Sequence, residues 1–230
     1  MRFLVKFRES AGALGMRNAS LYAGSRVLGA LFGSRVRIVK YYFMAQPVVG
    51  PGQAPPGTTG SFAVTWADAR CPLFSQVARP AATIAARFAQ GARCLVAVAH
   101  GAQLAGFLWF VIGPYEEDEV RARFVPKPDG EAAWDFDVTI MPQYRMGRLF
   151  SYLWRRASAE LAACGVKQTV SRISAFNATS LASHRRLGAR MVGEAIFICV
   201  GRCQLMKASS APHWHLSWRD DQRPVLAIEG

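Results

Sequence analysis

The stretch Trp134-Asp-Phe-Asp-Val-Thr-Ile140, followed by Met141-Pro-Gln-Tyr-Arg-Met-Gly-Arg148, decides the fold of this chain. Apolar and polar residues alternate over 134–140, which predicts a strand. A proline, a short basic turn with a glycine and the start of a helical pattern come next. Free N–H groups and the helix dipole both point at such a turn. The sequence therefore predicts a phosphate-binding turn at 141–148.

The elements that follow this turn carry a second pattern. Leu149, Leu153, Ala157 and Leu161 have helical spacing, and Gly165 is a natural end for that helix. A strand is predicted over 168–174, and after it comes the segment Asn177-Ala-Thr-Ser-Leu-Ala-Ser-His-Arg-Arg-Leu-Gly-Ala189.

This order of elements over residues 62–206 resembles the GNAT superfamily of acyl-CoA-dependent N-acyltransferases. The late helix of that family carries Asn, then a small residue three positions on, Tyr seven on and Gly eleven on, followed by Phe. The matching positions here hold Asn177, Ser180, His184, Gly188 and Ala189. Three of them agree, whereas His184 and Ala189 depart from the family pattern.

The resemblance implies an α/β (α+β) fold. Its central sheet is mixed and mostly antiparallel, with helices on both faces, and a splayed parallel strand pair forms the acyl-CoA cleft. The implied co-substrate is acetyl-CoA or another acyl-CoA, and no metal is implied.

The phosphate loop of the family reads Arg or Gln, two residues, Gly, one residue, then Gly or Ala. A register from Gln143 places Met146 at the first glycine, and a register from Tyr144 places Gly147 there but Leu149 at the small position. Guanidinium groups can also grip phosphate oxygens directly. The expected cofactor-binding residues are Ile140, Gln143, Tyr144, Arg145, Met146, Gly147, Arg148, Asn177 and Ser180.

Asp135 and Asp137 are the candidate general bases. Alternation predicts that both lie on one face of the strand over 134–140, about 7 Å apart. Burial would raise the pKa of either carboxyl toward neutrality, as deprotonation of an amine requires. The alternative is that the two acids balance nearby arginines.

His184 is the candidate acid for the leaving thiolate, because it stands where the family has Tyr. The alternative is a helix residue that bonds phosphate or sugar without proton transfer. No cysteine or serine lies in a nucleophile motif, which favours direct attack within a ternary complex.

Composition describes a basic chain with enough apolar residues for a large core. The 230 residues are 51% hydrophobic, and the net charge is +13. Such a charge indicates an anionic partner: nucleic acid, a membrane surface, an acidic carrier protein or a phosphate-rich cofactor. The basic residues are spread out and no stacking-aromatic motif occurs, so no specific nucleic acid is expected. Five cysteines without a CxxC pair favour a reducing cytosol.

The first 46 residues are predicted to be a basic extension. Residues 1–33 have partly helical spacing interrupted by glycines, and 35–46 reads as a strand at the edge of the main sheet. One interpretation places this extension on an anionic membrane surface or on an acyl carrier protein. The other has it cover the main domain or a partner chain, which leaves a homodimer open.

Residues 47–60 are rich in proline and glycine and are predicted to be a linker. The expected domain then covers 61–207, and 208–230 forms a tail. His213 and His215 in this tail lack a third ligand nearby, so no metal site is predicted. The acids at 116–119 are expected either to form a solvated loop or to attract a cationic acceptor.

The sequence thus predicts a cytoplasmic N-acyltransferase that moves an acyl group, with acetyl as the first choice, from acyl-CoA to the amine of a small molecule or protein. Two alternatives remain. One is a long-chain N-acyltransferase served by acyl carrier protein, and the other is a binding module that holds acyl-CoA without turnover.

Overall fold

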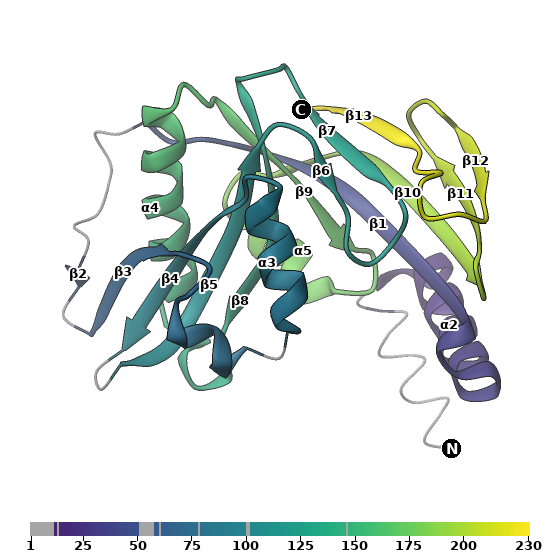
Figure 1. Cartoon of the computed structure of the whole chain (residues 1–230), viewed down its shortest axis with the longest axis horizontal. Coiled ribbons are helices and arrows are strands. Elements are labelled where there is room, and N and C mark those ends of the chain that lie inside the picture. Colours follow the sequence, from purple (N-terminus) through teal and green to yellow (C-terminus); the bar gives the residue numbers. More distant parts are fainter. Residues whose placement is uncertain are drawn as a thin grey trace.

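A ten-stranded sheet organises the chain (Figure 1). The computed structural model describes residues 12, 14–50, 58–59, 61–77, 79–99, 102–145 and 147–230. In spatial order the strands are β12 (Trp214–Ser217), β11 (Cys203–Ala208), β10 (Arg190–Val200), β1 (Val36–Pro47), β9 (Gln168–Ser174), β8 (Ala132–Ile140), β5 (Gln103–Ile112), β4 (Arg93–Ala99), β3 (Phe62–Ala67) and β2 (Thr58–Thr59). Among the described strands of this sheet, only β8 and β9 run parallel, and every other neighbouring pair is antiparallel.

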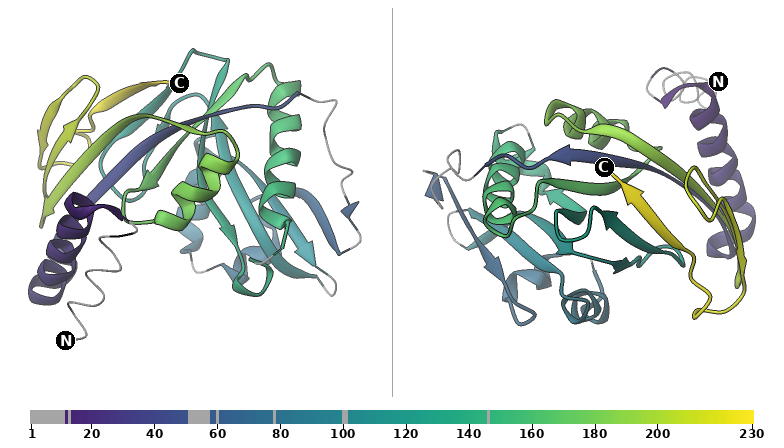
Figure 2. Two further views of the ribbon diagram at one scale, coloured as in Figure 1. Left: turned by 180° about the vertical axis from the view of Figure 1, so that it is seen from behind. Right: turned by 90° about the horizontal axis from the view of Figure 1, so that it is seen from above.

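Helices lie on both faces of this sheet, so the predicted fold class is confirmed. One face carries α3 (Ala81–Ala89) and a small sheet of β6 (Tyr115–Glu116), β7 (Arg123–Lys127) and β13 (Val225–Glu229). The other face carries α4 (Leu149–Ala163) and α5 (Ala178–Arg186), which Figure 2 shows from behind. Short 3-10 turns cover Gly33–Arg35, Pro72–Gln76 and Pro142–Tyr144.

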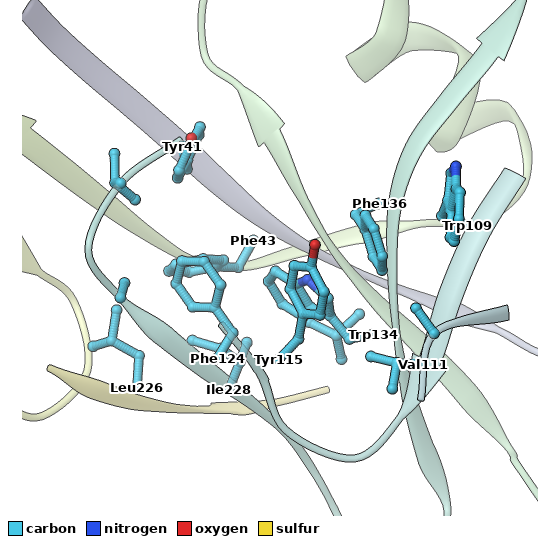
Figure 3. Packing of buried hydrophobic residues seen from close by; sticks show 14 of the residues in the cluster. Tyr41, Phe43, Trp109, Val111, Tyr115, Phe124, Trp134, Phe136, Leu226 and Ile228 are labelled. Carbon is cyan, nitrogen blue, oxygen red and sulfur yellow. The ribbon is translucent and has the colours of Figure 1, made fainter. Parts of the chain in front are cut away.

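An aromatic core fills the space between the main sheet and the small sheet (Figure 3). The rings of Phe124 and Trp134 stack with their centroids 4.7 Å apart, and those of Tyr115 and Phe136 stack at 4.2 Å. Trp134 and Phe136 come from alternate positions of β8, as its pattern predicts. The small sheet is held to the main sheet by these rings.

A second core lies between the sheet and α4. The predicted stripe of Leu149, Leu153, Ala157 and Leu161 is fully buried there. Gly165 follows the end of the helix and has a φ of +82°, a left-handed backbone conformation that glycine adopts at little cost in free energy. The helical spacing therefore identified the correct face of this helix.

The strand near the N-terminus lies inside the sheet, so the predicted edge position is wrong. Strand β1 pairs with β9 on one side and with β10 on the other. Tyr41 and Phe43 point into the aromatic core and are completely buried. The division of the chain into domains stays a prediction, and the linker residues 51–57 and 60 lie outside the described residues.

Helix α2 (Met16–Phe32) precedes β1 and lies against its outer face. Asn18 donates a hydrogen bond to the hydroxyl oxygen of Tyr42 at 2.8 Å and accepts one from Lys40 at 3.3 Å. The predicted helical segment is thus present here, whereas residues 1–11 and 13 lie outside the described residues. Within the described ranges, no helix has both the length and the apolar character needed to cross a membrane.

Candidate functional site

The parallel strands β8 and β9 part from each other halfway along. Their pairing covers only four positions of each strand and ends with Asp135 opposite Ser171. Beyond that point β8 stays bonded to β5 and β9 stays bonded to β1. A bulge lies directly after this point, because Asp137 and Val138 together stand opposite the single residue Leu108. The splayed strand pair that the sequence predicts is therefore present.

The turn after β8 ends at an uncapped helix. No side chain caps the N-terminus of α4, and its first turn contains no acidic residue. Arg145 folds back on the strand end, where its Nε donates to the carbonyl oxygen of Ile140 at 2.9 Å. Gln143, Gly147 and Arg148 are exposed beside it. These groups leave a basic helix terminus open to an anion.

Two further residues of the loop, Tyr144 and Gly147, have local contacts that the structure describes, while their expected contact with a cofactor stays a prediction. Tyr144 is half-buried, packs edge-on against Phe62 and donates to Gln103 at 3.3 Å, so it anchors the turn. A Cβ on Gly147 would meet the carbonyl oxygen of Tyr144 at 3.6 Å, which is an ordinary contact. Met146 lies outside the described residues.

Asp135 is buried without an ion pair, on the face that carries α4. The residue is 1% exposed, and neither carboxyl oxygen has a hydrogen-bond partner among the described residues. Burial raises its pKa to about 7, although the hydroxyls of Thr169 and Ser171 nearby favour the charged form slightly. Neither hydroxyl makes a hydrogen bond of normal geometry to it. Asp135 therefore has the acidity that a base working near neutral pH needs.

Asp137 lies on the opposite face, so the expectation that both acids share one face is wrong. Its φ of +48° rotates the side chain toward α3. There it accepts bonds from Arg87 at 2.7 Å and from Arg79 at 3.0 Å. These guanidinium groups outweigh burial and lower the pKa of Asp137. The alternative of an acid that balances arginines describes Asp137 but not Asp135.

His184 of α5 packs against α4. Its ring lies edge-on to Phe150 and Trp154, with centroids 5.8 and 5.5 Å away, and it is 3% exposed. Burial lowers its pKa to about 4, so the imidazole is neutral at pH 7. A neutral imidazole does not fit the expected role of an imidazolium acid for the leaving thiolate.

Asn177 and Ser180 shape the start of α5. The Oδ1 atom of Asn177 accepts the backbone N–H of Ser180 at 3.0 Å, which caps the helix. This local bond gives the family-like spacing of the two residues a structural reason. Contact of either residue with a cofactor stays a prediction.

The sequence did not predict the network of charged side chains near the point where β8 and β9 separate. Arg87, which is 3% exposed, binds Asp118 as well as Asp137. On the other side, Arg172 binds Glu117 at 2.7 Å. Glu119 lies 3.7 Å from Arg172 and accepts a hydrogen bond from Tyr41 at 2.5 Å, while Glu116 lies 3.5 Å from Arg223. The acids at 116–119 are thus occupied by arginines and do not form a freely solvated run.

One signal in the sequence could have found this network. Arg172 follows Val170 at an alternate position of β9, which places an arginine on the core side of the sheet. A buried arginine requires acids nearby, and the run at 116–119 is the richest source of them. The described residues contain no group of three or more His, Cys, Asp or Glu side chains placed to hold a metal ion.

Comparison with known proteins adds a likeness in fold. No protein-family model and no curated protein matches the chain. A functionally unknown conserved protein from Staphylococcus epidermidis is similar in structure with a TM-score of 0.51 and 9% identity, over 76% of this chain and 67% of that one. A Drosophila protein gives a TM-score of 0.50 and 13% identity, over 79% of this chain and 57% of that one.

A GNAT-family protein from Novosphingobium aromaticivorans gives a TM-score of 0.49 and 19% identity, over 71% of this chain and 66% of that one. This chain spans 57% to 67% of the lengths of the three structures. The structure itself has the mostly antiparallel main sheet and, among the described strands of that sheet, one parallel pair that parts, as the predicted fold requires. Sequence identities this low show a similarity of fold and nothing about activity.

Proposed function

We propose that this protein is an acyl-CoA-dependent N-acyltransferase. The observation that carries the proposal is the parting of β8 and β9 directly before a basic, uncapped helix terminus. A pantetheine arm is an extended, amide-bearing chain, and the unpaired strand edges offer N–H and C=O groups to it. The α4 terminus, Arg145 and Arg148 then receive the phosphates.

Asp135 is the proposed base of the reaction. It is the last residue of β8 that pairs with β9, so its position marks the point where the strands separate. The amine nitrogen bonds to the thioester carbon, the C–S bond breaks, and CoA leaves as the thiolate. The proton lost by the nitrogen goes to Asp135, whose pKa of about 7 suits that transfer.

The remaining polar residues hold the site in place. Asp137 is ionised and bound to two arginines, which fixes the bulge that turns β8 away from β9. The backbone around Ile140, held by Arg145, is the proposed hydrogen-bond donor to the thioester carbonyl. Asp137 is therefore a positioning residue and not a second base.

The test combines donor binding with thiol release. CoA binding is measured by calorimetry on the full chain, and thiol release is followed with acetyl-CoA, long acyl-CoA and acyl carrier protein donors over a panel of amines. Arg145→Ala and Arg148→Ala should each weaken CoA binding by about tenfold, as expected for a lost phosphate contact. Arg202→Ala is the matched control, because Arg202 is exposed on the distant turn between β10 and β11.

Asp135→Asn should lower kcat at least a hundredfold while CoA binding stays unchanged. Equal CoA affinity in wild type, Arg145→Ala and Arg148→Ala would reject the proposed phosphate site. Unchanged turnover in Asp135→Asn would reject the proposed base.

A second candidate is a module that binds acyl-CoA without turnover. The specific observation in its favour is that Asp137 is bound to two arginines and His184 is neutral, so two of the three expected catalytic groups do not fit the proton transfers expected of them. CoA binding that depends on Arg148, combined with no thiol release from any donor, would favour this candidate over the enzyme.

A further inference from the structure

The outer face of the sheet is apolar where β10, β11 and β12 form it. One row across these strands joins Ile198, Leu205 and Leu216, and the next row joins Ile196, Lys207 and Trp214. The alternate positions, such as Phe197 and Met206, fill the aromatic core. These strands are therefore apolar on both sides, as strands covered on both faces are.

No described helix covers this outer face. Helix α4 packs over β4, β5 and β8, and α5 packs beside Met44 and Ile173 of β1 and β9. Ile198, Val200, Trp214 and Leu216 are 39%, 54%, 59% and 46% exposed. Figure 2 shows α2 beside this end of the sheet, while α4 and α5 lie toward the other end.

Helix α2 continues the same apolar surface. Its inner side carries Asn18 and Ser25, which bond to β1. At 100° per residue, Met16, Val27 and Leu31 point directly away from that side. They are 64%, 48% and 69% exposed. An apolar stripe thus faces outward from a helix that already packs through its other side.

Positive charge surrounds this surface. Residues 14–50 contain Arg17, Arg26, Arg35, Arg37 and Lys40 and no acid. Residues 190–217 contain Arg190, Arg202, Lys207 and the single acid Glu194. Glu194 is already paired with Lys40 at 2.9 Å. The apolar surface is therefore framed by cations with no competing free carboxylate within these two ranges.

A groove of about 420 Å³ lies at the junction of α2 and β1. Its walls include Gly29 and Gly33, which leave room, together with Val36, Arg26 and the chain at Arg37, whose guanidinium group donates to the carbonyl oxygen of Glu119 on the other face of the sheet. An apolar recess beside the arginine at position 26 has the chemistry that receives a phosphate-bearing headgroup next to acyl chains.

We propose that the surface made by α2 and the outer face of β10–β12 docks on an anionic lipid bilayer. The exposed apolar side chains enter the boundary between headgroups and acyl chains, and the surrounding arginines and lysines meet the lipid phosphates. A second copy of this chain fits less well, because the positive charges of Arg17, Arg26, Arg202 and Lys207 would then face their counterparts. This inference does not depend on the proposed enzymatic activity.

Vesicle sedimentation of the full chain tests the proposal. The vesicles contain phosphatidylcholine with about 30% phosphatidylserine, and pure phosphatidylcholine vesicles serve as reference. The expected result is binding to the anionic vesicles alone, which weakens as salt increases. Val27→Glu, Leu31→Glu and Leu216→Glu should each lower the partition coefficient at least tenfold, and Arg26→Ala should lower it about fivefold.

Arg123→Ala and Val225→Glu are the matched controls. These two residues are partners on the exposed side of the small sheet, which packs on the opposite face of the main sheet from the proposed surface. Both should bind vesicles as the wild type does, and circular dichroism confirms that every variant is folded. Vesicle binding that does not depend on phosphatidylserine, or an equal loss of vesicle binding in the control variants, overturns the proposal. A dimer in light scattering that Leu31→Glu dissociates, without vesicle binding, overturns it in favour of a second copy.

Discussion

Asparagine in place of Asp135 removes a carboxyl that is buried without an ion pair. Burial raises the pKa of this group from 3.8 to about 7. Between these values the folded protein keeps the proton while the unfolded chain has lost it. The folded state therefore binds more protons, and the free energy of unfolding falls as pH rises through this window. Above pH 7 both states are ionised and the loss is complete.

The size of the effect follows from the shift. A rise in pKa of about three units corresponds to ~4 kcal/mol of unfolding free energy, since each pKa unit contributes ~1.4 kcal/mol. An asparagine amide does not titrate. The difference in unfolding free energy, variant minus wild type, should then grow by ~4 kcal/mol between pH 4 and pH 8. At pH 4 the variant should be no more stable than the wild type, because a buried amide without partners has its own cost.

Urea unfolding across this pH range measures the difference directly. Asp129→Asn is the control, because the Asp129 side chain is 77% exposed and its curve should run parallel to the wild type. Asp135→Asn should therefore be more stable than the wild type at pH 8 and should also lose turnover, whereas Asp129→Asn should do neither. Parallel curves for Asp135→Asn and wild type would refute the reasoning that the buried carboxyl is costly to ionise.

Three further substitutions test other parts of the structure. Arg87→Leu leaves Asp118 and Asp137 without their shared buried partner and should lower the unfolding free energy by ~3–5 kcal/mol, measured by urea unfolding at pH 7. His184→Phe should leave the pH profile of kcat unchanged. It should also reduce the loss of stability between pH 6.5 and 4, because the folded protein keeps this imidazole neutral while the unfolded chain protonates it. Asn177→Ala should lower stability by ~1 kcal/mol through the lost cap, and a thermal shift of a few degrees would show it.

Local periodicity was enough to predict most elements of the fold. The stripe that begins at Leu149 and the stop at Gly165 depend only on residues close in the chain. The strand at 134–140 and the helix after Asn177 were likewise readable from nearby residues. Their order then indicated the fold class.

The errors arose where distant residues decide the structure. Alternation assigned Asp137 to the face of Asp135, but the bulge depends on the pairing of β8 with β5 and on Arg87 from α3. The pattern of 35–46 predicted a strand but could not identify the strands that pair with it. Apolar residues on both of its sides, such as Val39 and Tyr41 against Ile38 and Tyr42, were a usable sign of an interior position. The acidic run similarly gave no hint by itself that Arg87 and Arg172 would occupy it.

The interior place of β1 has a consequence for biosynthesis. Residues 36–47 are synthesised well before β9, which begins at Gln168, and β10, which begins at Arg190. The nascent chain must carry Tyr41 and Phe43 without these two neighbouring strands until both have emerged, so maturation should be slow and sensitive to chaperones. A chain severed between Pro47 and Thr58 would keep an empty slot between β9 and β10, which a separate peptide of residues 36–47 is expected to fill and thereby restore the native sheet.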